Sequence, residues 1–125
     1  HEVQEVATSF APRALGAYSQ AIEANGFVFA SGQIPVNPET GEIPDGIEAQ
    51  AEQVMKNMKN LLEAAGTSID QVVKTSVFIK NMDDFATING IYAKYFEKDC
   101  PARSCVEIAR LPKDVLLEME AIAVK

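Results

Sequence analysis

The sequence predicts an α+β fold in which two helices pack on one face of a mixed β-sheet. Short segments with alternating apolar side chains are typical of strands, and two longer segments repeat their apolar residues with the period of a helix. Along the chain these segments follow the order strand, strand, strand, helix, strand, helix, strand, strand. This order favours a sheet covered by helices on one side.

The first three strands are expected near the N-terminus. Residues 3–7 form the first, and residues 17–23 and 27–31 flank the dipeptide Asn25-Gly26. Asn-Gly is a strong signal for a two-residue hairpin turn, because both turn positions need positive φ. The second and third strands are therefore predicted to pair as a hairpin.

A loop and the first helix come next. Residues 32–46 are rich in proline and glycine, which predicts a loop. Residues 47–65 repeat apolar side chains at helical spacing, and Gly66 supplies the expected C-terminal stop. The repeating residues are Ile47, Ala51, Val54, Met55, Met58, Leu61, Leu62 and Ala65.

The second half of the chain is predicted as strand, helix and two strands. Residues 73–79 alternate as a strand with Val73, Thr75, Val77 and Ile79 on one face. Residues 82–96 form the second helix, and its apolar stripe contains Phe85, Ile88, Tyr92 and Tyr95. The final strands are residues 104–110 and 115–124.

One face of the last strand is wholly apolar, and the other is too apolar for an open solvated surface. One carries Val115, Leu117, Met119, Ala121 and Ala123; the other carries Leu116, Glu118, Glu120, Ile122 and Val124. With both helices on one side of the sheet, the second face needs another cover, and self-association into a symmetric oligomer supplies it. The alternative is a monomer with an unusually apolar surface.

Composition limits the classes of function. At 125 residues the chain has the size of a single domain, expected over residues 2–125. A net charge of −7 argues against nucleic acid as a partner. No apolar run approaches the ~20 residues that cross a membrane. Cys100 and Cys105 are not spaced as C-x-x-C, so we expect a reduced, cytoplasmic protein.

The only histidine, His1, stands where a methionine should begin the chain and is interpreted as a tag remnant. Without it, no cluster of histidine, cysteine and carboxylate suits a metal, so none is expected.

The main candidates for catalytic residues lie near the C-terminus. Arg103 follows Pro101 at the entrance of one predicted strand, and Glu118 and Glu120 share a face of the last strand. Arginine is well shaped to hold a carboxylate with two parallel hydrogen bonds. A glutamate in an apolar strand is a plausible proton acceptor because burial raises its pKa. The alternatives are a surface arginine in an ion pair and two solvent-facing glutamates.

Alternation does not choose between the two glutamates. A fold-back centred between residues 111 and 112 places Glu118 opposite Cys105, whereas one centred between residues 112 and 113 places Glu120 there. Cys105 itself is a candidate nucleophile, but the chain offers no histidine to activate it, and a buried structural cysteine is the alternative.

Tyr18, Ser31 and Asn89 are polar residues in or beside apolar segments. Each is either a ligand contact or a structural hydrogen-bonding group. Neither a phosphate-binding loop nor a hydrolase nucleophile motif occurs in the sequence.

Several short motifs resemble one family over essentially the whole chain. They are Ala14-Leu15-Gly16-Ala17-Tyr18-Ser19-Gln20, Ser31-Gly32-Gln33-Ile34-Pro35, Gly41-Glu42, Val73-Lys74-Thr75, the 85–89 segment and Pro101-Ala102-Arg103-Ser104-Cys105-Val106 with its following Leu-Pro and Glu-x-Glu-x-Ile-Ala. On these motifs the chain is identified as similar to the RidA (YjgF-type) family of imine deaminases. One departure is Ala17, where the family usually has proline; alanine loosens the backbone before Tyr18 slightly.

The resemblance implies a chorismate mutase-like fold, assembled as a homotrimer with the sheets facing inward and clefts between subunits. It implies that Arg103 binds the substrate carboxylate and that Glu118, rather than Glu120, activates water. Further substrate-binding residues by this resemblance are Tyr18, Ser31, Gly32, Asn89 and the main chain of Cys105, partly from the adjacent subunit.

The implied reaction is hydrolysis of 2-imino acids, such as 2-iminobutanoate and 2-iminopropanoate, to 2-keto acids and ammonia without a cofactor. The alternatives are a non-catalytic small-molecule-binding, regulatory or chaperone-like protein, and a ribonuclease or translation inhibitor.

Overall fold

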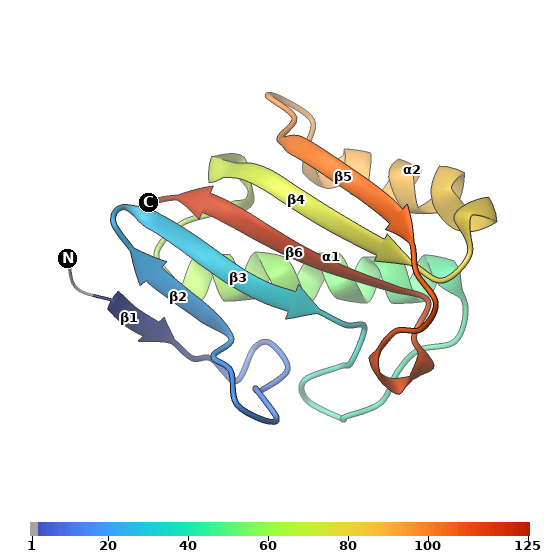
Figure 1. Cartoon of the computed structure of the whole chain (residues 1–125), viewed down its shortest axis with the longest axis horizontal. Helices are drawn as coiled ribbons and strands as arrows, with labels where there is room; N and C mark the ends of the chain where they lie inside the picture. Colours follow the sequence, from blue (N-terminus) through green and yellow to red (C-terminus); the bar gives the residue numbers. More distant parts are fainter. Residues whose placement is uncertain (1–2) are drawn as a thin grey trace.

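In the computed structural model, which describes residues 3–125, six strands form one sheet and two helices cover one of its faces (Figure 1). The strands are β1 (Val3–Val6), β2 (Ala21–Ala24), β3 (Phe27–Gln33), β4 (Val72–Ile79), β5 (Ala102–Glu107) and β6 (Leu117–Val124); the helices are α1 (Ile47–Ala64) and α2 (Phe85–Tyr95). The predicted α+β class and element order are confirmed. His1 lies outside the described residues.

The strand order across the sheet is β1-β2-β3-β6-β4-β5. Only β4 and β5 are parallel, so the sheet is mixed as predicted. The prediction that the last two strands fold back on each other was wrong, because β4 lies between β5 and β6. The connecting segment crosses the end of β4 instead: Ile108 N donates to Ile79 O, and Lys80 N donates to Leu116 O. Neither predicted hairpin register therefore exists.

The hairpin of β2 and β3 is confirmed, with φ of 54° at Asn25 and 81° at Gly26. However, β2 begins at Ala21, whereas the prediction began it at residue 17. The reason is the buried side chain of Gln20, which accepts from the N–H of Thr8 and donates to three carbonyl oxygens in residues 8–12. This amide holds the preceding segment in a loop and prevents it from extending the strand.

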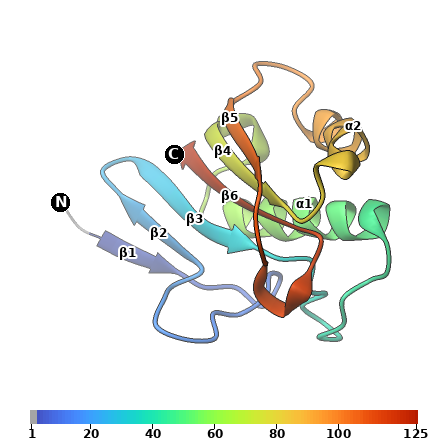
Figure 2. The ribbon, with the colours of Figure 1, turned by 45° about the vertical axis from the view of Figure 1, so that its right-hand side comes forward.

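Figure 2 shows α1 and α2 on the same side of the sheet. The hydrophobic core lies between these helices and the sheet. As predicted, one face of β6 is wholly buried, and the apolar stripe of α1 packs over it and β3. Fully buried residues of α1 include Val54, Met58, Leu61 and Leu62. The helix ends where predicted, with Gly66 at a φ of 85°.

A β-bulge in β4 changes which valine faces the core. Pairing with β6 steps from Val72–Ala123 to Lys74–Ile122, so Val73 is displaced to the surface and is 43 % exposed. The prediction that Val73 shares the buried face was wrong, since Val72 takes that place. Thr75, Val77 and Ile79 are buried as predicted.

Other differences are shifts of element ends. Gly32 and Gln33 belong to β3 rather than to the loop, β5 and β6 are shorter than predicted, and a 3-10 turn at Met82–Asp84 precedes α2.

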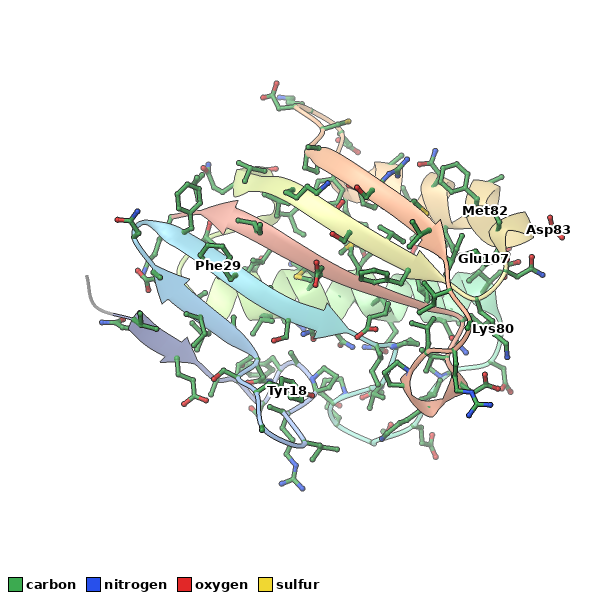
Figure 3. The ribbon with its side chains drawn as sticks, in the orientation of Figure 1. Tyr18, Phe29, Lys80, Met82, Asp83 and Glu107 are labelled. Carbon is green, nitrogen blue, oxygen red and sulfur yellow. The ribbon has the colours of Figure 1, made fainter. Side chains whose placement is uncertain are left out.

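The sheet face away from the helices carries exposed apolar side chains, among them Phe27 and Phe29 of β3 and Val106 of β5 (Figure 3 labels Phe29). This is the uncovered face that the sequence predicts, and its association with other copies stays a prediction. Among the described residues, neither helix combines the length and apolarity that crossing a bilayer requires.

Candidate active site

The side chain of Arg103 rests on one stripe of α2. Its guanidinium carbon lies 4.8 Å from the centre of the Tyr92 ring and 5.4 Å from that of Phe85. Its Nη1 donates to Oδ1 of Asn89 at 2.8 Å. Spacings of four and three residues place Phe85, Asn89 and Tyr92 on the same side of the helix. The helix therefore provides two ring faces and one amide for a single guanidinium.

Arg103 forms no ion pair with a carboxylate among residues 3–125, and its side chain is exposed. The alternative interpretation as a surface ion pair is therefore wrong within the described chain. A guanidinium has five N–H donors, and the bond to Asn89 uses one of them. An anchored, exposed guanidinium of this kind is suited to bind a carboxylate from outside the chain.

Glu118 lies on the other face of the sheet, where it pairs with Phe78 of β4. Its carboxylate packs on Gly32, which lies in a bulged stretch of β3. The side chain is half-buried, and burial, followed by the negative charge of Glu120, raises the pKa of the Glu118 carboxyl. The structure thus brings Gly32 and Glu118 together and gives the glutamate the raised pKa that its apolar strand predicts.

Tyr18 and Ser31 come from the segments beside this glutamate. Tyr18 is exposed (Figure 3), and its Oη accepts a hydrogen bond of 3.4 Å from the N–H of Leu15. Tyr18 and Gly32 line the same pocket of about 520 Å³. The hydroxyl of Ser31 donates to the carbonyl of Ser19 at 2.6 Å, so it holds two chain segments together.

Cys105 lies on the helix side of the sheet, paired with the buried Val77. Burial raises the pKa of the Cys105 thiol despite the nearby positive charge of Arg103, which disfavours the nucleophilic thiolate form. The structure therefore favours a structural side chain over a nucleophile. Because β5 is an edge strand, alternate main-chain groups along it have no strand partner.

Six of the seven candidate residues form two groups, and Ser31 precedes Gly32 in β3. We call Arg103, Asn89 and Cys105 the Arg103 cluster, and Tyr18, Gly32 and Glu118 the Glu118 cluster. Arg103 pairs with Thr75 and Glu118 with Phe78 along β4. Residues three apart on a strand face opposite ways, so the sheet lies between Arg103 and Glu118. A ligand of a few atoms cannot contact both side chains of one chain.

Sequence reasoning missed both this separation and the aromatic support of Arg103. The separation follows from the parallel pairing of β5 with β4, which residue alternation does not reveal. In the sequence, the two aromatic residues that support Arg103 belong to the apolar stripe containing Phe85 and Tyr92. Such a stripe predicts core packing equally well.

Gly32→Ala is expected to reduce activity by displacing the Glu118 carboxylate. A Cβ at residue 32 would stand 2.8 Å from Cδ of Glu118 and closer still to Oε2, so the glutamate must move. Gly90→Ala in α2 is the matched control, because a Cβ there meets nothing within 4 Å. Kinetic constants of both variants test this contact. Equal activity of the two variants would show that the position of the carboxylate does not matter.

Comparison with known proteins assigns the chain to a family. Residues 8–125 match the family model described as endoribonuclease L-PSP. The chain is 51 % identical to a 2-iminobutanoate/2-iminopropanoate deaminase of Escherichia coli K12, with 96 % of each chain covered. It is 52 % identical to a RutC family protein of Haemophilus influenzae, over 98 % of this chain and 97 % of that protein.

Solved structures agree with these sequence matches. The fold superposes on E. coli TdcF with bound serine with a TM-score of 0.94 and 48 % identity, covering 98 % of each chain. The resemblance stated from the motifs is confirmed: this chain belongs to the endoribonuclease L-PSP family, which is the RidA/YjgF family.

Proposed function

We propose that this chain hydrolyses small 2-imino acids, such as 2-iminobutanoate and 2-iminopropanoate, to 2-keto acids and ammonia. The observation that carries the proposal is the guanidinium of Arg103, which α2 anchors but no carboxylate of the described chain neutralises. A 2-imino acid carries the carboxylate that such a group binds. Relatives at 50 and 51 % identity carry the name of this deaminase.

In the proposed reaction Arg103 orients the substrate through its carboxylate, which places the imine carbon at a fixed distance from the water. Glu118 accepts a proton from that water as its oxygen bonds to the imine carbon and the C=N electron pair moves to nitrogen. Glu118 returns this proton to the nitrogen, which gives a neutral carbinolamine. The hydroxyl proton of the carbinolamine then moves to nitrogen as the C=O bond forms and the C–N bond breaks, so that ammonia leaves and the 2-keto acid remains. The C=N carbon is electrophilic by itself, so the proposed step requires no cofactor.

We further propose that the site forms between copies of the chain. Arg103 and Glu118 lie on opposite faces of one sheet, so a complete site needs the Arg103 cluster of one copy and the Glu118 cluster of another. Phe27, Phe29 and Val106 are exposed on the open face, and burying them would favour association of this face with another copy. Following the family resemblance, the proposed assembly is a homotrimer with Ser31 and the other site residues at the clefts. Native mass measurement tests it.

The reaction is tested with 2-iminobutanoate generated in situ by an amino-acid oxidase. The expected result is that the protein increases the rate of ammonia release over the spontaneous rate. Binding of 2-oxobutanoate without any acceleration would instead support a regulatory sensor, and RNA cleavage that persists in Arg103→Ala would support a nuclease.

The pH dependence of kcat/KM is expected to report Glu118. A general base must be ionised, so activity should fall on the acidic side as Glu118 takes up a proton. The charge of Glu120 contributes to the raised pKa of Glu118. Glu120→Gln removes that charge and should move the acidic limb of the profile to lower pH. An acidic limb that stays in place or moves upward in this variant would contradict the assignment.

A further inference from the structure

The tyrosine that supports Arg103 is itself fixed on two sides. The hydroxyl of Tyr92 lies 2.8 Å from Oγ1 of Thr75, and the Thr75 side chain is fully buried. The Tyr92 ring also packs against Phe96, with 4.5 Å between ring centroids. Burial raises the pKa of the Tyr92 hydroxyl, which keeps this group neutral and available for the hydrogen bond. The face presented to Arg103 is therefore held in one orientation.

Thr75 connects both ends of the arginine side chain to the sheet. On β4 it is the register partner of Arg103, and its hydroxyl holds the ring under the guanidinium. Thr75 therefore helps to position both the backbone of Arg103 and its guanidinium. Asn89 holds one end of the guanidinium through the bond to Nη1, while the central carbon of the guanidinium lies over the Tyr92 ring.

We propose that Tyr92 is a positioning residue for carboxylate binding: it holds the guanidinium of Arg103 ready for two parallel hydrogen bonds. This inference rests on the proposed function, in which Arg103 binds the substrate carboxylate. A long arginine side chain loses rotational freedom when it binds, and a site that has already fixed the side chain avoids that loss. A cation over an aromatic face gains electrostatic attraction from the ring. Tyr92 does not touch substrate in this account and acts only through Arg103.

A purely structural role for Tyr92 predicts a different result from a positioning role. Arg103 contacts the carboxylate in both ground state and transition state, so loosening it chiefly weakens binding and raises KM, with a smaller fall in kcat from the less exact orientation of the substrate. Loss of core packing lowers stability without changing KM. Tyr95 supplies the matched control, because it lies on the same helix and donates to Glu52 rather than supporting Arg103.

The test compares Tyr92→Leu, Tyr92→Phe and Tyr95→Leu in the full-length protein. KM for 2-iminobutanoate and Kd for 2-oxobutanoate are measured together with thermal stability. We expect Tyr92→Leu to raise both constants about three- to tenfold. Tyr92→Phe retains the ring and should recover most of this loss. Tyr95→Leu should lower stability but leave both constants at the wild-type values.

Wild-type KM and Kd in Tyr92→Leu would overturn the inference, as would an equal rise in Tyr95→Leu. If Tyr92→Leu fails to fold, Thr75→Val removes the hydroxyl with little change in shape and should raise Kd about twofold or more; an unchanged Kd would again overturn it. Wild-type protein that binds 2-oxobutanoate but hydrolyses no imine refutes the proposed reaction and leaves the positioning test valid. Wild-type protein that does not bind 2-oxobutanoate refutes the positioning role as well.

Discussion

Arg103→Ala is expected to reduce kcat/KM for 2-iminobutanoate by about a hundredfold or more while the fold and assembly persist. A hydrogen bond to a charged group contributes about 1.5–3 kcal/mol, and a bidentate pair contributes two of them. The fold should tolerate the change because the side chain is exposed and its one hydrogen bond within the described chain is to Asn89. Steady-state kinetics and native mass measurement check the two parts.

Two further arginine variants sharpen this result. Arg103→Lys keeps the charge but loses the planar fork, so it should retain only part of the activity. Arg110→Ala is the control, because Arg110 is an exposed arginine a few residues beyond β5 and belongs to neither cluster. Turnover close to wild type in Arg103→Ala would refute the assignment of the carboxylate site.

Glu118→Gln is expected to lower kcat by about a hundredfold, in the range typical of a lost general base. Gln cannot accept the proton from water, but it retains the shape that packs on Gly32. Affinity for 2-oxobutanoate should therefore stay close to wild type. Single-turnover kinetics and calorimetric titration of the keto acid measure the two effects separately.

The same variant should also be more stable than wild type at neutral pH. Burial raises the pKa of Glu118 in the folded protein above its ordinary value of 4.5. A carboxyl whose folded pKa is raised favours folding at low pH, and this contribution is lost as pH rises through the ordinary pKa toward the folded one. Glutamine does not ionise, so the gain in Tm should be larger at pH 7 than at pH 4.

Glu120→Gln is the control for the kinetic measurement, because Glu120 is exposed and shares the face of Glu118. It should retain most of the wild-type kcat. A larger loss of kcat in Glu120→Gln than in Glu118→Gln would mean that the wrong glutamate has been assigned to water.

The elements that local patterns specify were predicted well from the sequence. The stripe of α1 and the Asn25-Gly26 turn depend on residues close together in the chain, so their signals are complete within a short window. Strand order, in contrast, depends on pairing between segments that are far apart in the chain. Alternation tells which face of a strand a side chain occupies but not which strand lies beside it. The prediction paired the last two strands because they are neighbours in sequence, and β4 separates them.

The candidate site likewise combines features that local patterns predict with features that long-range pairing determines. Residue chemistry pointed to Arg103 and to the pair Glu118 and Glu120, and only the family resemblance chose Glu118 as the proposed base. Their placement on opposite faces depends on the parallel register of β5 with β4, a long-range pairing that no local pattern encodes. Support of Arg103 by Tyr92 was hidden for another reason. An aromatic residue in an apolar helical stripe predicts a core position, and Tyr92 is buried while its ring also lies under the guanidinium.

Mixed assemblies test directly whether a complete site takes Arg103 from one copy and Glu118 from another. Arg103→Ala and Glu118→Gln chains are unfolded, mixed in equal amounts and refolded together. In a random symmetric assembly, half of the copies donate Arg103 and half of their neighbours donate Glu118. The mixture should therefore recover about a quarter of wild-type activity, although each variant alone is nearly inactive. A mixture no more active than the mean of the two separate variants would contradict a site shared between copies.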